Sequence, residues 1–255
     1  MCAESEDKTP FVFILSWNRP LYLWVCLDSI YRHTEHDCRI VLADNNSTDP
    51  LVHQVIDGFE KRNMFYAVHR YSNNDPFRFE KLIKEYAPKM GEYFVLIESD
   101  IEILPFSACW LSTLVNHMDM DSTIASIGSR VYQKDFVSFE EARKLQPDTP
   151  AHELNQLIKS HAPMRRYKYT KKLLISPHNP PLRLLLVRKS AYDKIIFGRD
   201  TEIHHHFIKL GYQSLISTQV IHRHLSLLNI YDYSSFSNKA RDEFFDKQLN
   251  NDSTY

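Results

Sequence analysis

The stretch RIVLADNNSTDP (residues 39–50) contains the pattern that decides the fold class. Its apolar first half predicts a buried strand ending at Asp44, and the polar residues after it predict a loop. Asp49 and Pro50 are suited to the N-cap and the first position of a helix. The apolar residues that follow have helical spacing: Val52, Val55, Ile56 and Phe59. The stretch therefore predicts one strand–loop–helix unit.

The same unit recurs on both sides of this stretch. FVFILSW (11–17) predicts a buried strand, and Pro20 opens the helix that follows it. Downstream, strands are predicted over 65–70 and 93–99, with a helix around 76–86 between them. Alternation of this kind indicates a largely parallel α/β sheet with helices on its faces.

The second half of the chain contains elements of both kinds. The predicted elements are helices near 105–119 and over 189–211, and strands over 123–129, 182–188 and 213–224. Residues 133–180 are polar, rich in Lys, Pro and His, and less regular. With no internal repeat and no Gly/Ser-rich linker, the sequence predicts one domain over 10–237 with tails at 1–9 and 238–255.

Composition excludes several classes of protein. Lysine and arginine (31) nearly balance aspartate and glutamate (32) in the 255 residues, so we expect no nucleic-acid partner. No apolar run approaches the roughly 18 residues of a membrane span, and the N-terminus lacks a signal-peptide pattern. The four cysteines show no CxxC spacing, as expected of reduced thiols. We therefore expect a cytoplasmic protein.

Neither GxxxxGK[ST] nor GxGxxG occurs, so we expect no phosphate-binding loop of the P-loop or dinucleotide-binding kind.

Polar residues stand at the ends of three predicted strands. They are Trp17-Asn18, Asp44-Asn45 and Glu98-Ser99-Asp100. Ligands of parallel sheets bind beyond the carboxyl ends of the strands, so this edge is the candidate binding site.

The third of these endings lies in FVLIESDIEI (94–103). Alternate residues of a strand face the same way, so Glu98, Asp100 and Glu102 could share a side. Three carboxylates at such short distances from one another repel each other unless a cation lies between them. Oxygen ligands suit Mg²⁺ or Mn²⁺. A strand end that is simply solvated is the alternative interpretation. A Walker-B strand is a third, but the sequence has no P-loop to act with it.

Histidines and acids near the C-terminus provide further candidates. His222 and His224 could face one way at the end of a strand and bind a metal, although such pairs are more often structural. The run 204–206 cannot chelate one ion, because consecutive helical residues point about 100° apart. Asp200 and Glu202 stand where a helix begins; the helix dipole explains acids there, and a general base is the functional alternative.

A cationic segment, RRYKYTKK, begins with Arg165 and ends with Lys172. A solvated loop is the default interpretation. Contact with an anionic substrate, or peripheral contact with a membrane surface, is the alternative.

The N-terminal motifs resemble those of GT-A-fold glycosyltransferases of family 2, which are inverting enzymes that use nucleotide sugars. FILSWNRPLYLWVCLDSI (13–30) is similar to the family's first strand, its (Y/W)NR motif and its leucine-rich helix. IVLADNNSTDP (40–50) resembles the second strand and loop. ESD (98–100) stands where the family carries its DxD motif, with glutamate in place of the first acid.

Later segments resemble the same family. Residues 182–212 are similar to its segment of apolar strand, "ED" motif and helix ending at glycine, although Arg199 replaces the first acid of the motif. VIHRH (220–224) falls where many members have a metal-binding histidine. The resemblance covers about 10–130 and 178–226, which makes 10–130 the nucleotide-sugar-binding half and 131–237 the acceptor-side half.

The resemblance implies a role for individual residues. Binding of the nucleotide sugar would involve Ser16, Trp17, Asn18, Arg19, Asp44, Asn45, Glu98 and Ser99. The metal ligands would be Asp100 with His222 or His224, and the metal Mn²⁺ or Mg²⁺. The catalytic base would be Asp200, with Glu202 as the fallback.

The implied reaction transfers a sugar from a nucleoside-diphosphate donor, with UDP as the expected nucleotide, to a glycan or a lipid-linked or protein-linked acceptor. One alternative is an inactive nucleotide-sugar-binding or regulatory protein of the same fold, which Arg199 favours. A nucleotidyltransferase is a further alternative, but the glycine-rich loop typical of that class is absent.

Overall fold

The structure is a computed structural model that describes residues 9–105, 108–132, 138–145, 147–160, 172–176, 183–195 and 200–225. The cationic stretch 165–171, Arg199 and the predicted tail 238–255 lie outside these ranges. The side chain of Asp200 is also outside the description, whereas its backbone is included.

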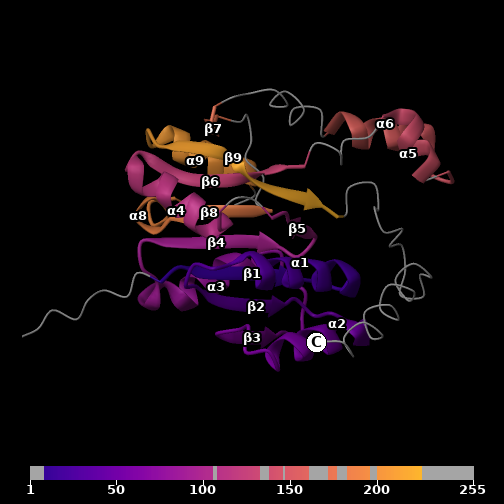
Figure 1. The fold of residues 1–255 in the computed structure, drawn as a ribbon, viewed down its shortest axis with the longest axis horizontal. Coiled ribbons are helices and arrows are strands. Elements are labelled where there is room, and N and C mark those ends of the chain that lie inside the picture. The colour runs from indigo at the N-terminus through magenta and orange to yellow at the C-terminus, as the bar shows by residue number, and fades with distance from the viewer. Residues whose placement is uncertain are drawn as a thin grey trace, which may run out of the picture.

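One sheet forms the centre of the molecule (Figure 1). Within the described residues it has nine strands in the order β3-β2-β1-β4-β8-β6-β9-β5, and β7 pairs with β9. The strands are β1 Phe11–Ser16, β2 Arg39–Asp44, β3 Ala67–Arg70, β4 Tyr93–Glu98, β5 Ile101–Ile103, β6 Ile124–Val131, β7 Leu174–Ile175, β8 Leu184–Arg188 and β9 Gln213–His224. Strands β1, β2, β3, β4, β6 and β9 run in one direction, and β5, β7 and β8 run in the opposite direction. The predicted α/β class with a mostly parallel sheet is confirmed.

Helices cover both faces of the sheet. The helices of the described residues are α1 Pro20–His33, α2 Pro50–Glu60, α3 Arg78–Tyr86, the short 3₁₀ helix η1 Ala87–Lys89, α4 Trp110–Met120, α5 Phe139–Leu145, α6 Ala151–Ser160, α8 Lys189–Tyr192 and α9 Asp200–Lys209, of which α5 and α6 lie to the side of the sheet. Val12 and Ile14 of β1 pack with α1, α2 and α4, whereas Phe11 and Phe13 pack with α3, α8 and α9. This alternation is the period of two expected of a strand buried on both faces.

The strand predicted over 93–99 is β4, and the rest of the stretch 94–103 contains a second strand, β5, that was not predicted. Strand β4 ends at Glu98, Ser99 and Asp100 form a turn, and β5 then pairs antiparallel with β9. The change of partner buries Ile101 and Ile103 in the core beside α1 and α4. The interpretation of three carboxylates on one side is therefore wrong.

Two further segments differ from expectation. The segment 133–180, predicted to be less regular, contains α5 and α6, which pack on each other and lie to the right of the sheet in Figure 1. The helical region predicted over 189–211 is divided into α8 and α9.

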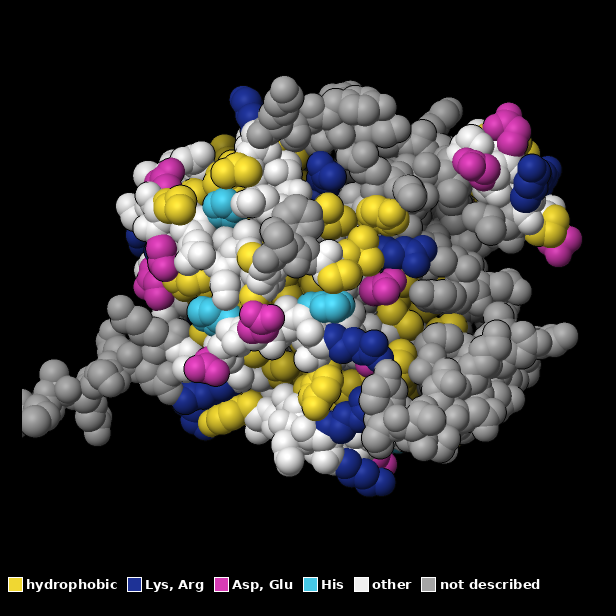
Figure 2. All heavy atoms as spheres, viewed as in Figure 1, with side chains coloured by type: hydrophobic (Ala, Val, Ile, Leu, Met, Phe, Trp, Pro, Cys, Tyr) yellow, Lys and Arg dark blue, Asp and Glu magenta, His cyan; other side chains and the backbone are white. Residues whose placement is uncertain are grey.

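The described surface carries charges of both signs. In Figure 2, Lys and Arg side chains lie next to Asp and Glu side chains, with His side chains nearby. This mixture agrees with the formal net charge of −1. Within the described residues, no helix combines the length and the apolar character needed to cross a membrane.

Helix α2 begins as its sequence predicts. Oδ1 of Asp49 accepts a hydrogen bond from the backbone N–H of Leu51 at 3.0 Å. We expect Asp49→Ala to lower the free energy of unfolding by about 1 kcal/mol, because this backbone donor loses its acceptor. Urea denaturation would measure the change, and Asp49→Asn, which keeps an oxygen acceptor, should recover most of it. Equal stability of the alanine variant and the wild type would contradict this assignment.

Candidate active site

The carboxyl ends of β1, β2 and β4 meet at one edge of the sheet, as predicted. The N–H of Asn45 donates to the carbonyl of Ser16 at 2.7 Å, which joins the end of β2 to that of β1. The N–H of Ser99 donates to the carbonyl of Leu15 at 3.1 Å, which joins the end of β4 to β1. The predicted polar endings are therefore neighbours in space.

The turn between β1 and α1 is strained. Asn18 and Arg19 both have positive φ, 51° and 57°, a region that asparagine tolerates and arginine rarely adopts. The N–H of Asn18 donates to Oγ of Ser47 at 2.7 Å, and its Oδ1 accepts from the N–H of Thr48 at 2.9 Å. The amide of Asn18 thus ties the first loop to the second. Held strain of this kind is typical of ligand-binding turns.

The two predicted residues after β2 have different surroundings. Asp44 is buried, and its Oδ1 accepts from the N–H of Ser47 at 3.1 Å, while Nδ1 of His53 lies 3.7 Å from Oδ2. Asn45 donates through Nδ2 to Oδ1 of Asn74 at 2.9 Å, and its Oδ1 accepts from Nε of Arg78 at 3.1 Å. The side chain of Asn45 therefore holds the loop before α3. Asp44 remains the candidate for the nucleotide.

Two predicted residues face solvent near the strained turn. The Trp17 side chain is 55% exposed immediately after β1. The guanidinium of Arg19 lies 3.8 Å (Nη1) from Oδ2 of Asp100 and over the ring of Tyr22. An exposed indole and a cation at this edge suit a ligand that has both a ring and negative charge.

Tertiary structure brings Asp100 and His224 together. Nε2 of His224 lies 3.3 Å from Oδ2 of Asp100, although 124 positions separate the two residues in sequence. The pairing of β5 with β9 causes this, because Ile101 is opposite His224 and the N–H of Leu225 donates to the carbonyl of Asp100 at 2.8 Å. Glu102 is instead paired with Arg223 at 3.5 Å.

Arg183 completes this cluster, and sequence reasoning did not identify it. Its Nε donates to Nε2 of His224 at 3.0 Å. Its carbonyl accepts from the N–H of Glu98 at 3.1 Å, so the end of β4 holds its backbone. The only signal in the sequence is a cation directly before the buried strand β8, which does not reveal the strand's antiparallel partner.

His222 lies beside this cluster in a fully buried position. Its Nδ1 is 2.7 Å from Oγ of Ser129, and its Nε2 has no hydrogen-bond partner among the described residues. Burial, and then the positive charge of Arg183, hold the pKa of His222 well below its usual range, although Asp100 opposes the shift. The imidazole is therefore neutral, as a metal ligand must be.

Asp100 and His224 suit a divalent cation. Ligands about 2.1 Å from an octahedral ion lie about 3.0 Å apart at right angles, close to the 3.3 Å between these two donor atoms. Carboxylate and imidazole donors fit Mn²⁺ or Mg²⁺. In the described part of the chain, no three His, Cys, Asp or Glu side chains form a complete site. Water and phosphate oxygens would therefore supply the other ligands, as is common for Mg²⁺.

Helix α9 positions the predicted base. It begins at Asp200, and Ile203 and Phe207 bury its inner face on the sheet. Gly211, with φ 81°, closes the helix, and β9 then returns along it. The first turn of α9 consequently points toward the edge where β9 ends. Glu202 is exposed.

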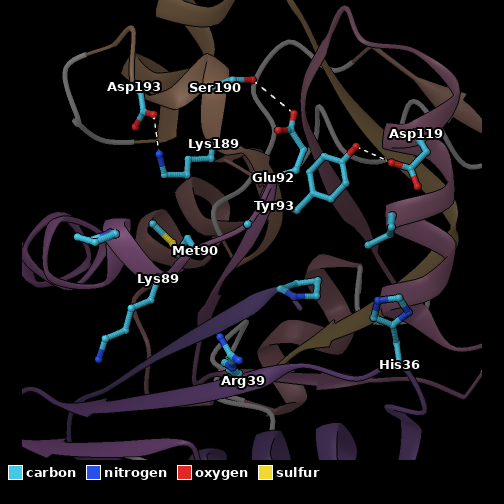
Figure 3. A pocket seen from close by; sticks show the side chains of 14 residues that line it. His36, Arg39, Lys89, Met90, Glu92, Tyr93, Asp119, Lys189, Ser190 and Asp193 are labelled. Atoms are coloured by element: carbon cyan, nitrogen blue, oxygen red, sulfur yellow. Dashed lines mark hydrogen bonds and ion pairs between the residues drawn. The ribbon is translucent and has the colours of Figure 1, made fainter. Parts of the chain in front are cut away.

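A separate cavity of about 940 Å³ lies at the opposite edge of the sheet (Figure 3). Pro10 and Arg39 line it at the starts of β1 and β2. Its carboxylates have partners within the protein: Asp193 with Lys189 at 2.9 Å, Glu92 with Arg188 at 2.8 Å and Asp119 with Oη of Tyr93 at 2.6 Å. The cluster at Asp100 is thus the better candidate for chemistry.

This mostly parallel sheet flanked by helices is the GT-A class of fold. The chain belongs to glycosyl transferase family 2, whose sequence profile matches residues 11–195. No curated protein sequence matches the chain.

Solved structures show the same fold at low sequence identity. GalNAc-T7 with UDP, GalNAc and Mn²⁺ is 14% identical with a TM-score of 0.59, and the match covers 85% of this chain and 44% of that one. The mannosyltransferase PcManGT of Pyrobaculum calidifontis, with GDP-Man and Mn²⁺, is 13% identical with a TM-score of 0.55, covering 86% and 60%. Glucosyl-3-phosphoglycerate synthase of Mycobacterium tuberculosis, with Mn²⁺, UDP and glucosyl-3-phosphoglycerate, is 17% identical with a TM-score of 0.51, covering 85% and 72%. The chain thus spans less than two thirds of the first two.

Proposed function

We propose that the protein is a metal-dependent glycosyltransferase that moves a sugar from a nucleoside-diphosphate donor to an acceptor hydroxyl, with inversion. UDP is the proposed nucleotide, and a glycan or a lipid-linked or protein-linked sugar is the proposed acceptor. The observation that carries this proposal is the approach of Asp100 to His224 at 3.3 Å, on the edge of the sheet where Asp44 ends β2.

The donor would bind across the ends of β1, β2 and β4. Asp44 and the backbone of residues 16–18 would contact the base and ribose, and the exposed indole of Trp17 offers an apolar surface beside them. Arg19, which lies 3.8 Å from Asp100, and Arg183, which donates to His224, would neutralise part of the diphosphate charge. Glu98 ends β4 next to this position, and Ser99 follows it in the turn.

Asp100 and His224 would hold Mn²⁺ or Mg²⁺, which as a Lewis acid stabilises the negative charge that develops on the leaving diphosphate. Asp200, at the start of α9, would accept the proton of the attacking hydroxyl. A base on one side of the sugar and the leaving diphosphate on the other give inversion. The complexes of structurally similar proteins with UDP or GDP-Man and Mn²⁺ support this choice of ligands.

A panel of UDP-, GDP- and dTDP-sugars with Mn²⁺ or Mg²⁺ tests the proposal. We expect one donor class to raise the melting temperature and to release free nucleoside diphosphate only when the metal is present. EDTA should abolish the release. A donor that stabilises the fold without any release would instead indicate an inactive nucleotide-sugar-binding protein, and release of pyrophosphate would indicate a nucleotidyltransferase.

A further inference from the structure

Arg183 and Asp100 approach the same nitrogen of one histidine. Nε of Arg183 lies 3.0 Å from Nε2 of His224, and Oδ2 of Asp100 lies 3.3 Å from it. A guanidinium has donors and no acceptor, so Nε2 must accept and cannot carry a proton. The carboxylate therefore faces an unprotonated nitrogen, with the Arg183 guanidinium hydrogen-bonded to that nitrogen and the Arg19 guanidinium 3.8 Å from the carboxylate.

The lone pair that accepts from Arg183 is also the one that would ligate a metal. An imidazole nitrogen has one lone pair, which cannot accept the Arg183 N–H and bind a cation at the same time. Arg183 and a metal consequently exclude each other at His224. Asp100 and His224 can therefore bind a divalent cation together only after the Arg183 guanidinium has moved away from Nε2 of His224.

The surroundings of Arg183 allow such a movement. Its backbone is fixed, because its carbonyl accepts from the N–H of Glu98 at 3.1 Å. Its side chain is only partly buried. Rotation of the side chain is therefore enough to release His224. A second guanidinium, that of Arg19, lies 3.8 Å from Asp100. When a divalent cation binds beside Arg19 and Arg183, the site has an excess of positive charge, which an anion must balance.

We propose that Arg183 is an exchangeable cation, which occupies the metal-binding lone pair of His224 until the donor arrives and then transfers to the donor's diphosphate. This inference rests on the proposed function. It implies that metal and nucleoside diphosphate bind cooperatively, since the anion gives the displaced guanidinium a new partner. Arg183 is in this sense a positioning residue for the metal ligands and a binding residue for the donor.

Mn²⁺ titration followed by the EPR signal of the free ion tests the exchange, with and without UDP or GDP. We expect the wild type to bind Mn²⁺ weakly alone and at least tenfold more tightly with the preferred nucleotide. Arg183→Met should bind Mn²⁺ alone about tenfold more tightly than the wild type, because a charge-assisted hydrogen bond no longer competes. The same variant should lose most of the tightening by nucleotide.

Arg19→Met is the matched control. It also removes one positive charge near Asp100, but it leaves the Arg183–His224 hydrogen bond intact, so its Mn²⁺ affinity should rise only about two- to threefold. Circular dichroism would show whether each variant is folded, and Arg183→Gln is the second variant if Arg183→Met is not.

Equal or weaker Mn²⁺ binding in the folded Arg183 variant, compared with Arg19→Met, would overturn the exchange. The proposed function would survive that result if the wild type still released nucleoside diphosphate in the donor panel. Conversely, tighter Mn²⁺ binding by Arg183→Met with no release from any donor would support the exchange and count against transferase activity.

Discussion

Asp100→Asn is expected to lower metal-dependent release of nucleoside diphosphate by roughly 10³-fold while leaving the fold intact. Asparagine keeps the size of the side chain and removes the charged oxygen that faces Nε2 of His224 at 3.3 Å. A metal that stabilises the leaving group contributes several kcal/mol, and each 1.4 kcal/mol is about tenfold in rate. Initial rates with the preferred donor, together with Mn²⁺ binding by EPR, would measure the loss.

Glu102→Gln is the matched control for this prediction. Glu102 lies two residues further along but pairs with Arg223, so it belongs to the other side of β5. Its loss should change the rate by less than about threefold, as expected of a partly exposed ion pair. Full activity of Asp100→Asn would remove the metal role from this residue.

Asp200→Asn is expected to reduce turnover by 10²–10⁴-fold with little change in donor affinity, a range typical of lost general-base catalysis. The amide cannot accept the proton of the attacking hydroxyl. The donor should bind as before, since its proposed contacts lie at the ends of β1, β2 and β4. Single-turnover rates would report the chemistry, and calorimetry with the nucleoside diphosphate would report binding.

Glu202→Gln separates the two acids at the start of α9. Glu202 is exposed in the first turn of the helix, and we expect its variant to keep normal turnover. If Asp200→Asn turns over normally and Glu202→Gln does not, the base is Glu202. If neither variant loses turnover, the base lies elsewhere.

Local patterns in the sequence were sufficient for most of the elements. The apolar runs of β1, β2 and β4 predict strands because a strand buried on both faces needs apolar residues throughout. Asp49-Pro50 predicts the start of α2 because an N-cap is a contact between near neighbours. The common edge of these strands also follows, since parallel strands end on the same side.

The division of 94–103 into β4 and β5 was not predictable in this way. The sequence predicts one strand over 93–99, and the alternating residues 101–103 (IEI) resemble a continuation of it rather than a separate strand. The separation arises because β5 pairs with β9, more than a hundred positions later. The structure of α5 and α6 likewise appears within a segment whose composition predicts irregular chain.

The candidate site shows the same limit at the level of single side chains. Asp44, Asp100 and His224 are recognisable as chemical candidates from their type and position. The contacts around them are not recognisable in this way. Asn45 holds a loop through its hydrogen bond with Arg78. Arg183 and Asp100 both approach Nε2 of His224.

The sequence alone therefore determined most of the elements, the edge of the sheet and the acids on it, because these depend on periodicity and on contacts between near neighbours. Only the tertiary structure decided which residues meet, because the register of β9 against β5 and of β8 against β4 depends on packing between distant segments. That register brings Arg183, His224 and Asp100 to one point, and no local pattern encodes it.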